Sequence, residues 1–357
     1  MTDFDEELRR SLEADADSKV AAAKEELKFY RKRLKVTEAE RDALQEQIDV
    51  FVRSEGVSVE INPWAAPKAS KKKHRATAML HLSDLHLDEV VDYDEVQGLN
   101  RYDRAIATQR LKKVVDGTIS MTRDVLSSYS WDGAVLLLGG DLVSGGIHDE
   151  LRETNDAVSV IDTVDYWADP LTQVAAALLE EFGHLQIISV PGNHGRNTRK
   201  PRSKGRSRDS FDWLLSRMVA RQFAGDSNVV ANIPDSSDAY FNVYGKRYLT
   251  THGDQARGGS GISGLLTPLS LLDHRKRKRD AAAFGETYED LWIGHWHQWL
   301  QMGSVHVNGS LKGIDEYAFQ SNFGFEQPIQ GFTVFTPEHG VTMQLPIYCQ
   351  DRDKEGW

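Results

Sequence analysis

Five apolar segments of this chain end in side chains that can bind divalent metal ions. The ends read Asp84-Leu85-His86, Gly140-Asp141, Gly192-Asn193-His194, His252-Gly253-Asp254 and Gly294-His295-Trp296-His297. The preceding apolar runs are typical of buried strands, and the carboxyl ends of parallel strands meet at one edge of a sheet. Glycine beside a ligand lets the backbone turn sharply and approach an ion closely. The spacing therefore predicts that these ends form one site.

The side chains at these ends are imidazoles, carboxylates and an amide, with no thiolate. Such ligands suit Mn²⁺, Fe or Zn²⁺ in a reactive site rather than a structural zinc cage. There are seven candidates, which is more than one ion needs: Asp84, His86, Asp141, Asn193, His252, His295 and His297. We therefore predict a cofactor of two divalent metal ions, with Mn²⁺ favoured and Fe or Zn²⁺ as alternatives.

The order of the five blocks over about residues 77 to 310 resembles the calcineurin-like metallophosphoesterase superfamily. The resemblance implies that one ion is held by Asp84, His86 and His297, the other by Asn193, His252 and His295, with Asp141 bridging them. Two ions roughly 3.5 to 4 Å apart bind a phosphate and lower the pKa of a bridging water. The expected activity is phosphoester hydrolysis.

His194 follows a candidate ligand and is not needed as one. We expect it to act as the general acid for the leaving group, because histidine donates or accepts protons near neutral pH. The alternative is a histidine that orients a ligand. Many members of the superfamily carry an acid at the next position, where this chain has Gly195, so Asp141 or Asp254 is expected to steady the ring instead.

The remaining histidines that we considered are expected to lie in the core or on the surface: His81, His148, His184, His274 and His306. Of these, His148 is the one to watch for a role at the site. The segment after Asp141 lacks the Asp-Arg-Gly motif of the superfamily's serine/threonine phosphatases, which weakens that assignment.

The chain has 357 residues, 40% of them hydrophobic, and a net charge of -11. This length suffices for one large core with an appendage. A single cysteine, Cys349, excludes an intramolecular disulfide framework and fits a reducing compartment. No apolar run approaches the roughly 20 residues that span a bilayer. We expect a cytoplasmic protein without a membrane partner.

Residues 5 to 54 contain no proline or glycine, and their apolar positions repeat every seven residues. Eight of the ten a and d positions between Val20 and Phe51 are apolar, which favours a coiled coil and hence self-association. The alternative is a helix folded back on its own domain. The predicted domains are a helical coiled coil (1–55), a basic linker (56–76) and a phosphoesterase domain (77–357).

The phosphoesterase domain is predicted to begin with alternating strands and helices and to end in strands. Helices are expected at 105–126, 157–182 (broken at Pro170) and 210–223, and strands at 239–251, 290–293, 298–308 and 330–346. This order predicts an α/β fold in which two sheets form a sandwich with helices outside, the four-layer fold that the resemblance also implies.

Basic residues are concentrated in two runs, at 196–208 and at 275–279. Both are predicted to lie in loops that border the site, where they could neutralise a nucleic-acid backbone. The candidate contacts are Arg196, Arg199, Arg275, Lys276 and Arg277. The alternative is a pair of solvated loops.

Three functions remain open from the sequence. The favoured one is a nuclease acting on DNA or RNA, which resembles the SbcD-type repair nucleases of the superfamily, and the chain's compact size and loop style resemble phage-encoded proteins. The second is a phosphatase or a phosphodiesterase for small molecules such as cyclic nucleotides, with Trp296, Trp299 or Tyr317 stacking on a base. The third is a metal-stabilised scaffold that recruits a partner through the coiled coil.

Overall fold

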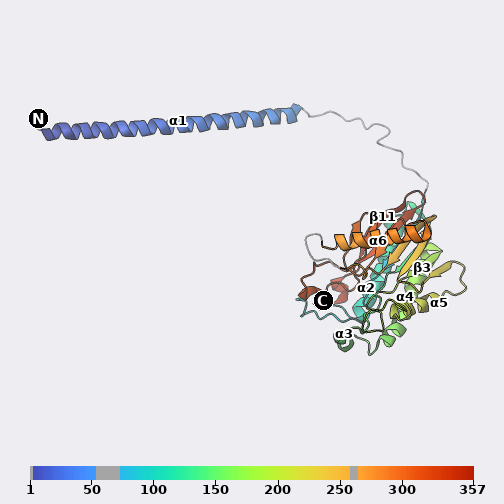
Figure 1. The fold of residues 1–357 in the computed structure, drawn as a ribbon. Helices are drawn as coiled ribbons and strands as arrows, with labels where there is room; N and C mark the ends of the chain where they lie inside the picture. The colour runs from blue at the N-terminus through green and yellow to red at the C-terminus, as the bar shows by residue number, and fades with distance from the viewer. Residues whose placement is uncertain (1–2, 54–72, 258–263) are drawn as a thin grey trace. The chain divides into compact units, whose positions relative to one another are not determined.

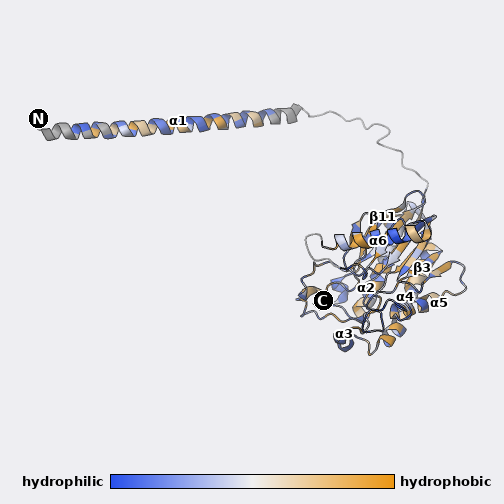
Figure 2. Ribbon diagram, in the orientation of Figure 1, coloured by the Kyte–Doolittle hydropathy of each residue, from blue (hydrophilic) through white to orange (hydrophobic). Residues whose placement is uncertain are grey.

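The computed structural model describes residues 3–53, 73–257 and 264–357, which belong to two units, Met1–Ser70 and Lys71–Trp357. The first unit contains one helix, α1 (Asp3–Arg53), along which hydrophobic and hydrophilic residues are mixed (Figure 2). The side chains of Val20, Leu27 and Leu34, at predicted seam positions, are 51 to 58% exposed in the single chain. The predicted helix is therefore present, and its self-association stays a prediction.

The predicted linker lies outside the described residues up to residue 72. Its last residues are part of a strand, because β1 (His74–Leu82) already pairs with β2 (Tyr129–Leu138) from His74 onward. Arg75 adds an ion pair of 3.0 Å to Asp132 across this pairing. The prediction that the linker extends to residue 76 was wrong for this reason.

Two β-sheets form the centre of the second unit (Figure 1). The six-stranded sheet has the order β11-β10-β1-β2-β3-β4, in which β1 to β4 are parallel and β10 and β11 are antiparallel. Besides β1 and β2 it contains β3 (Leu185–Ser189), β4 (Val229–Asn232), β10 (Ile329–Thr336) and β11 (Gly340–Tyr348). The five-stranded sheet has the order β5-β6-β7-β9-β8, with β5 (Asp238–Val243), β6 (Lys246–Thr251), β7 (Leu291–Ile293), β8 (Leu300–Met302) and β9 (Val305–Val307).

The two sheets pack face to face, and helices cover their outer faces. Met79, Leu137 and Ile188 of the first sheet share a buried cluster with Phe241 and Trp292 of the second. The outer face of the first sheet packs against α2 (Arg104–Ser120), α4 (Val160–Phe182) and α5 (Phe211–Arg221), and that of the second against α6 (Leu266–Phe284). Shorter elements are the π-helical turn η1 (Met121–Val125), α3 (Asp149–Thr154), α7 (Glu316–Gln320) and α8 (Arg352–Glu355). The four-layer fold is confirmed.

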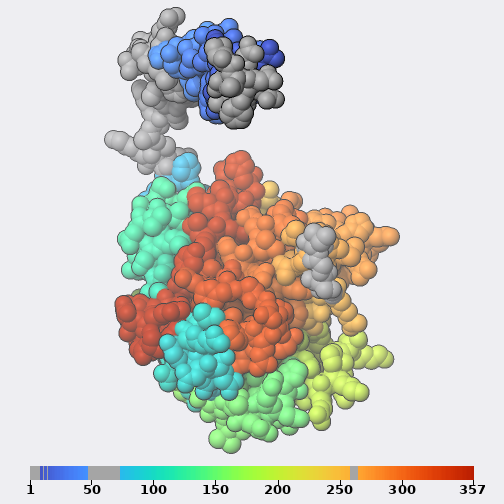
Figure 3. Space-filling view, turned by 90° about the vertical axis from the view of Figure 1, so that its left-hand side faces the viewer, coloured from blue at the N-terminus to red at the C-terminus, as the bar shows by residue number. Residues whose placement is uncertain are grey.

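Segments far apart in the sequence meet on the surface beside the sheets. Figure 3 shows the cyan segment near residue 100 against orange residues of the last third of the chain. There the buried side chain of Asn100 donates hydrogen bonds of 2.8 and 2.7 Å to the carbonyls of Lys312 and Ile314. These contacts fix the loop that follows the first site block to the loop that follows β9.

Two predictions about helices were wrong. Helix α4 continues through Pro170, because its buried face, including Trp167, Leu171 and Val174, packs on the sheet and outweighs the lost hydrogen bond. The basic run at 275–279 lies inside helix α6, not in a loop.

Candidate dinuclear metal centre

The candidate ligands lie at the carboxyl ends of β1, β2, β3, β6 and β7, where the loops of both sheets meet. Five of the seven have left-handed backbones, with φ between 46° and 69°: Asp84, His86, Asp141, His295 and His297. This conformation is unfavourable for residues other than glycine and is concentrated at functional sites. The fold thus holds these ligand-type side chains in strained positions at one sheet edge.

Three overlapping clusters of ligand-type atoms form there, and the atoms of each lie within 4.8 Å of one another. The first contains Asp84, His86 and His297, and the Nε2 atoms of the two histidines lie 3.1 Å apart. The second contains Asp141, His252 and His295, with 2.9 Å between His252 Nε2 and Asp141 Oδ2. The third contains His86, Asp141 and His194, so the Asp141 carboxylate lies between the first two clusters and His194 is also within reach of the site.

The donor set fits two divalent ions. Asn193 Oδ1 is buried without a hydrogen-bond partner in the described part of the chain, as expected for an atom that completes a metal site. Burial lowers the pKa of both His86 and His295 to about 4, so these rings are neutral near pH 7 and offer lone pairs. Burial alone would raise the pKa of Asp141, but the charges of His252 and His194 lower it well below its usual range.

Asp212, which no motif contains, connects the loops that carry the ligands. Its buried carboxylate accepts hydrogen bonds of 2.9 to 3.2 Å from the backbone N–H groups of Asp141, Leu142, Val143 and Gly192. A Cβ atom at position 195 would lie 2.5 Å from the Asp212 carboxyl carbon. A side chain at position 195 would therefore collide with Asp212, and glycine avoids this collision.

Glu89 is a second buried carboxylate that the sequence analysis missed. Its Oε2 lies 3.1 Å from Nδ1 of His86 and 3.0 Å from the hydroxyl of Ser144. Its other oxygen accepts a bond of 2.6 Å from Lys312, which is itself fully buried and also pairs with Asp315. The pair of Glu89 and Lys312 orients His86 so that Nε2 faces the first cluster.

The ring of His194 lies at the edge of the first cluster, 4.6 Å from the ring of His86 between centroids. Its Nδ1 lies 3.2 Å from the carbonyl oxygen of Ser144, so neither expected carboxylate steadies the ring. Asp141 instead accepts from the backbone N–H of His194, and Asp254 pairs with Arg206 at 2.8 Å. The Ser144 carbonyl oxygen therefore takes the place that we had expected Asp141 or Asp254 to occupy beside the His194 ring.

The other histidines are not in these clusters, among the residues that the structure describes. The exposed side chain of His148 lies nearest, with its ring centroid 6.2 Å from that of His194. His81 is buried in the core beneath the site.

Three of the five side chains predicted to contact substrate already bind other groups of the domain. Arg196 donates to the carbonyls of Asn193 and Thr198, the buried Lys276 pairs with Asp238 at 2.6 Å, and Arg277 binds Asp273 and two carbonyls. Arg199 makes only an exposed ion pair with Asp149 at 3.3 Å. Arg275 is exposed and has no partner among the described residues. Helix α6 buries Lys276 and leaves Arg277 half-buried, and both already pair with acids of the domain, so their substrate roles stay predictions.

The fold and the site together define a metal-dependent phosphoesterase with two adjoining sets of metal ligands. A family model described as calcineurin-like phosphoesterase matches residues 78–323, and the chain belongs to this family. Members depend on a dinuclear metal centre, and the chain is thus a metal-dependent hydrolase of phosphoesters. This assignment supports an enzyme over the non-enzymatic scaffold, and recruitment of a partner through residues 5 to 54 stays a prediction.

Solved structures that are similar to this chain share little of its sequence. A dimetal phosphatase from Danio rerio is 11% identical over 77% of this chain and 99% of its own, with a TM-score of 0.33. A putative 5'-nucleotidase from Staphylococcus aureus is 12% identical over 79% of this chain and 57% of its own, with a TM-score of 0.34. Vacuolar protein sorting 29 from Cryptosporidium parvum is 10% identical over 76% of this chain and 98% of its own, with a TM-score of 0.29. No curated protein sequence matches the chain. In the described part of the chain no helix is long and apolar enough to cross a membrane.

Proposed function

We propose that this phosphoesterase is a nuclease that hydrolyses phosphodiester bonds of DNA or RNA. The observation that supports this substrate is the cationic border of the metal centre. A small cavity beside Asn193 is lined by Arg196, Arg202 and Arg206 together with Asp209 and Asp254, and Asp254 pairs with Arg206. Of these, Arg202 is exposed and has no partner among the described residues, so it is free to contact a phosphate.

The seven candidate ligands are proposed to hold two Mn²⁺ ions as the sequence suggested: Asp84, His86 and His297 for one, Asn193, His252 and His295 for the other, and Asp141 for both. Bound divalent ions neutralise phosphate charge and lower the pKa of a coordinated water. Asp84 is ready for this role because, although burial raises its pKa, the hydrogen bond and charge of His297 lower it to about 2. Its carboxylate also accepts bonds from the Ser83 hydroxyl and the His295 N–H.

His194 is proposed to donate a proton to the departing oxygen. The contact of Nδ1 with the Ser144 carbonyl leaves Nε2 to face the substrate. Burial lowers the pKa of His194, so the free ring is neutral at pH 7 and a bound phosphate anion must raise the pKa for it to act as an acid. His194→Asn should keep its metal content and slow turnover by roughly 10² to 10⁴. Loss of both ions from this variant, measured by elemental analysis, would assign His194 to the metal instead.

The test is hydrolysis by the Mn²⁺-loaded protein of single-stranded DNA, double-stranded DNA, RNA, a cyclic nucleotide, a phosphopeptide and bis-p-nitrophenyl phosphate. We expect cleavage of at least one polynucleotide and of the aryl diester, with both lost in Asp141→Asn and after chelation. Cleavage of the cyclic nucleotide or the phosphopeptide without any polynucleotide would replace the nuclease assignment by the matching alternative. Chelation without effect on the aryl diester would contradict the metal mechanism itself.

A further inference from the structure

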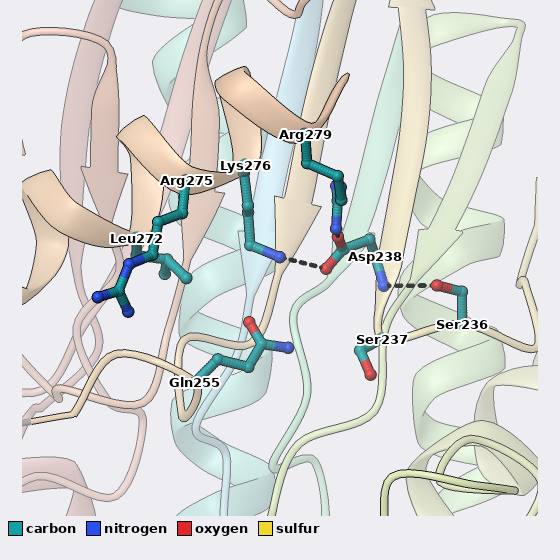
Figure 4. Close-up of a pocket in the computed structure, with 8 residues that line it drawn as sticks. All are labelled: Ser236, Ser237, Asp238, Gln255, Leu272, Arg275, Lys276 and Arg279. Atoms are coloured by element: carbon teal, nitrogen blue, oxygen red, sulfur yellow. Dashed lines mark hydrogen bonds and ion pairs between the residues drawn. The ribbon is translucent and has the colours of Figure 1, made fainter. Parts of the chain in front are cut away.

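A cavity of about 380 Å³ lies between the edge strand β5, helix α6 and the loop that follows β6 (Figure 4). We call it the α6 pocket. Its lining residues are Ser236, Ser237, Asp238, Gln255, Leu272, Arg275, Lys276 and Arg279. None of these belongs to the metal centre, and none of the aromatic residues proposed to stack on a base lines it. The pocket is therefore a separate feature that the hydrolytic site does not explain.

The charged groups of the α6 pocket leave one positive charge without compensation. Lys276 and Arg279 both bind the carboxylate of Asp238, at 2.6 and 2.8 Å, and Arg279 also binds the buried Asp280 at 2.8 Å. These two acids balance these two cations. Arg275 lines the same pocket, is exposed, and has no acidic partner among the described residues. An anion in the pocket would supply the missing charge.

The neutral groups of the α6 pocket are available as hydrogen-bond donors. The Ser236 hydroxyl oxygen accepts the Asp238 N–H at 3.1 Å and keeps its own proton to donate. The Gln255 carbonyl oxygen lies 3.0 Å from the Thr251 hydroxyl, which leaves the amide NH₂ group without a partner in the described part of the chain. Cations with free hydroxyl and amide donors recognise phosphate oxygens.

The α6 pocket is close to the metal centre along the chain. Gln255 follows the candidate ligand His252 by three residues, and three residues span at most about 10 Å. One strand of a nucleic-acid helix rises about 3.4 Å per phosphate along its axis, and successive phosphates lie further apart than this rise, so the reach corresponds to at most about three nucleotides. Asp254, between these two residues, pairs with Arg206 and fixes the loop.

We propose that the α6 pocket binds a phosphate of the polynucleotide strand within about three nucleotides of the bond being hydrolysed, with Arg275 as its principal contact. This inference rests on the proposed nuclease function and adds a specificity site to it. The pocket discriminates a polynucleotide from a small diester, because only the former extends beyond the metal centre. Lys276 and Arg279 hold Asp238 in place, and the N–H of Asp238 in turn positions the Ser236 hydroxyl. Arg275 supplies the positive charge that has no acidic partner among the described residues.

The experiment compares Arg275→Ala with the matched variant Lys278→Ala, which removes the same charge from an exposed residue of α6 that does not line the pocket. For an oligonucleotide that the wild type cleaves, Arg275→Ala should raise KM roughly tenfold at unchanged kcat, as for a lost hydrogen bond to a charged group. The slope of log KM against log salt should fall by roughly 0.7 to 0.9. Arg275→Lys should recover part of both effects, and Lys278→Ala should resemble the wild type.

The control substrate is bis-p-nitrophenyl phosphate, on which all these variants should equal the wild type. The inference is overturned if Arg275→Ala and Lys278→Ala cleave the oligonucleotide with the same KM and the same salt dependence, a result that leaves the nuclease function intact. A wild-type protein that hydrolyses the aryl diester and no polynucleotide overturns the nuclease function and, with it, the pocket's ligand.

Discussion

Glu89 connects a candidate metal ligand to a buried lysine, with contacts of 3.1 Å to His86 and 2.6 Å to Lys312. Glu89→Gln keeps the shape and one acceptor but removes the charge that fixes the His86 ring. Loss of such a partner typically costs 10- to 100-fold in metal affinity, so we expect the Mn²⁺ dissociation constant to rise by roughly this factor. Chelator competition measures it, and the exposed Glu95→Gln serves as the control. Equal affinities in the two variants would contradict the role of Glu89.

Gly195 and Asp212 provide a test of backbone packing behind the site. In Gly195→Ala the new Cβ would lie 2.5 Å from the Asp212 carboxyl carbon, so the loop must move and the carboxylate must lose backbone partners. We expect the free energy of unfolding to fall by about 1 to 3 kcal/mol. Gly324→Ala is the control, because nothing lies within 4 Å of its Cβ position. Urea denaturation that gives both variants the same stability would show that the loop adapts without cost.

Buried neutral histidines make the metal-free protein sensitive to acid. Burial lowers the pKa of His81 to about 3 and those of His86 and His295 to about 4, whereas unfolded imidazoles titrate near 6.5. Unfolding therefore takes up these protons, and the stability present above about pH 6.5 is lost as the pH falls toward 4. Asp212, whose pKa burial and Asp141 raise to about 6, opposes this by one proton.

Between about pH 4.5 and 6 the net effect is an uptake of roughly two protons, each worth about 1.4 kcal/mol per pH unit. Although burial lowers the pKa of His252, the charge of Asp141 raises it to about 10, so His252 opposes this trend only above about pH 6.5. Urea denaturation of the metal-free protein between pH 4.5 and 7.5 measures the slope. Stability that stays constant or rises on acidification would contradict the neutral state of these rings.

The ligands could be predicted from the sequence because each is adjacent to an apolar strand and a glycine. The carboxylates behind them could not, since their partners are distant along the chain. Glu89 and Lys312 are 223 residues apart, and Asp212 reaches Asp141 across 71 residues. The sequence does not show which distant group a carboxylate will pair with, and only the folded chain reveals these partners.

Among the elements, those with a clear apolar periodicity were predicted well and those that depend on tertiary contacts were not. The strands that carry the ligands and the helix α5 lie where the pattern placed them. Helix α6 was missed because its basic run resembles a solvated loop, and its buried Lys276 and Asp280 have partners from β5 that the sequence does not indicate. Local pattern identifies an element only where burial follows the same pattern.

Pro170 inside α4 is a testable consequence of this packing. A proline within a helix removes one backbone hydrogen bond and costs up to about 3 kcal/mol relative to alanine. Because α4 already continues through this position, Pro170→Ala should restore the bond and raise the melting temperature. Thermal unfolding measures the gain, and Pro201→Ala, outside the regular elements, is the control. A lower melting temperature in Pro170→Ala would show that the packing of the proline ring stabilises the fold more than the restored hydrogen bond does.

At the scale of the whole molecule, helix α1 is set apart by the exposure of its apolar residues. Leu27 and Leu34 are 51 and 58% exposed in the single chain and occupy the predicted seam. Phe29 and Val36 are similarly exposed, at 57 and 53%, with the same seven-residue spacing but on another face. Exposure alone therefore does not distinguish the two faces, and the row of Phe29 and Val36 is itself apolar, since it continues as Ala22, Ala43 and Val50. The seam differs because its a and d rows lie side by side, whereas the rows on either side of Phe29 and Val36 are mostly charged or polar.

We propose that residues 5 to 54 join chains through this seam, where each buried leucine contributes about 1.5 to 3 kcal/mol. The variant with both Leu27→Lys and Leu34→Lys should sediment as a monomer, because two charges would enter the seam of each helix. The variant with both Phe29→Lys and Val36→Lys should remain associated. Both should hydrolyse bis-p-nitrophenyl phosphate at the wild-type rate, since no site residue lies in α1. A wild-type protein that sediments as a monomer at micromolar concentration would leave the helix folded back on its own domain as the remaining explanation of the repeat.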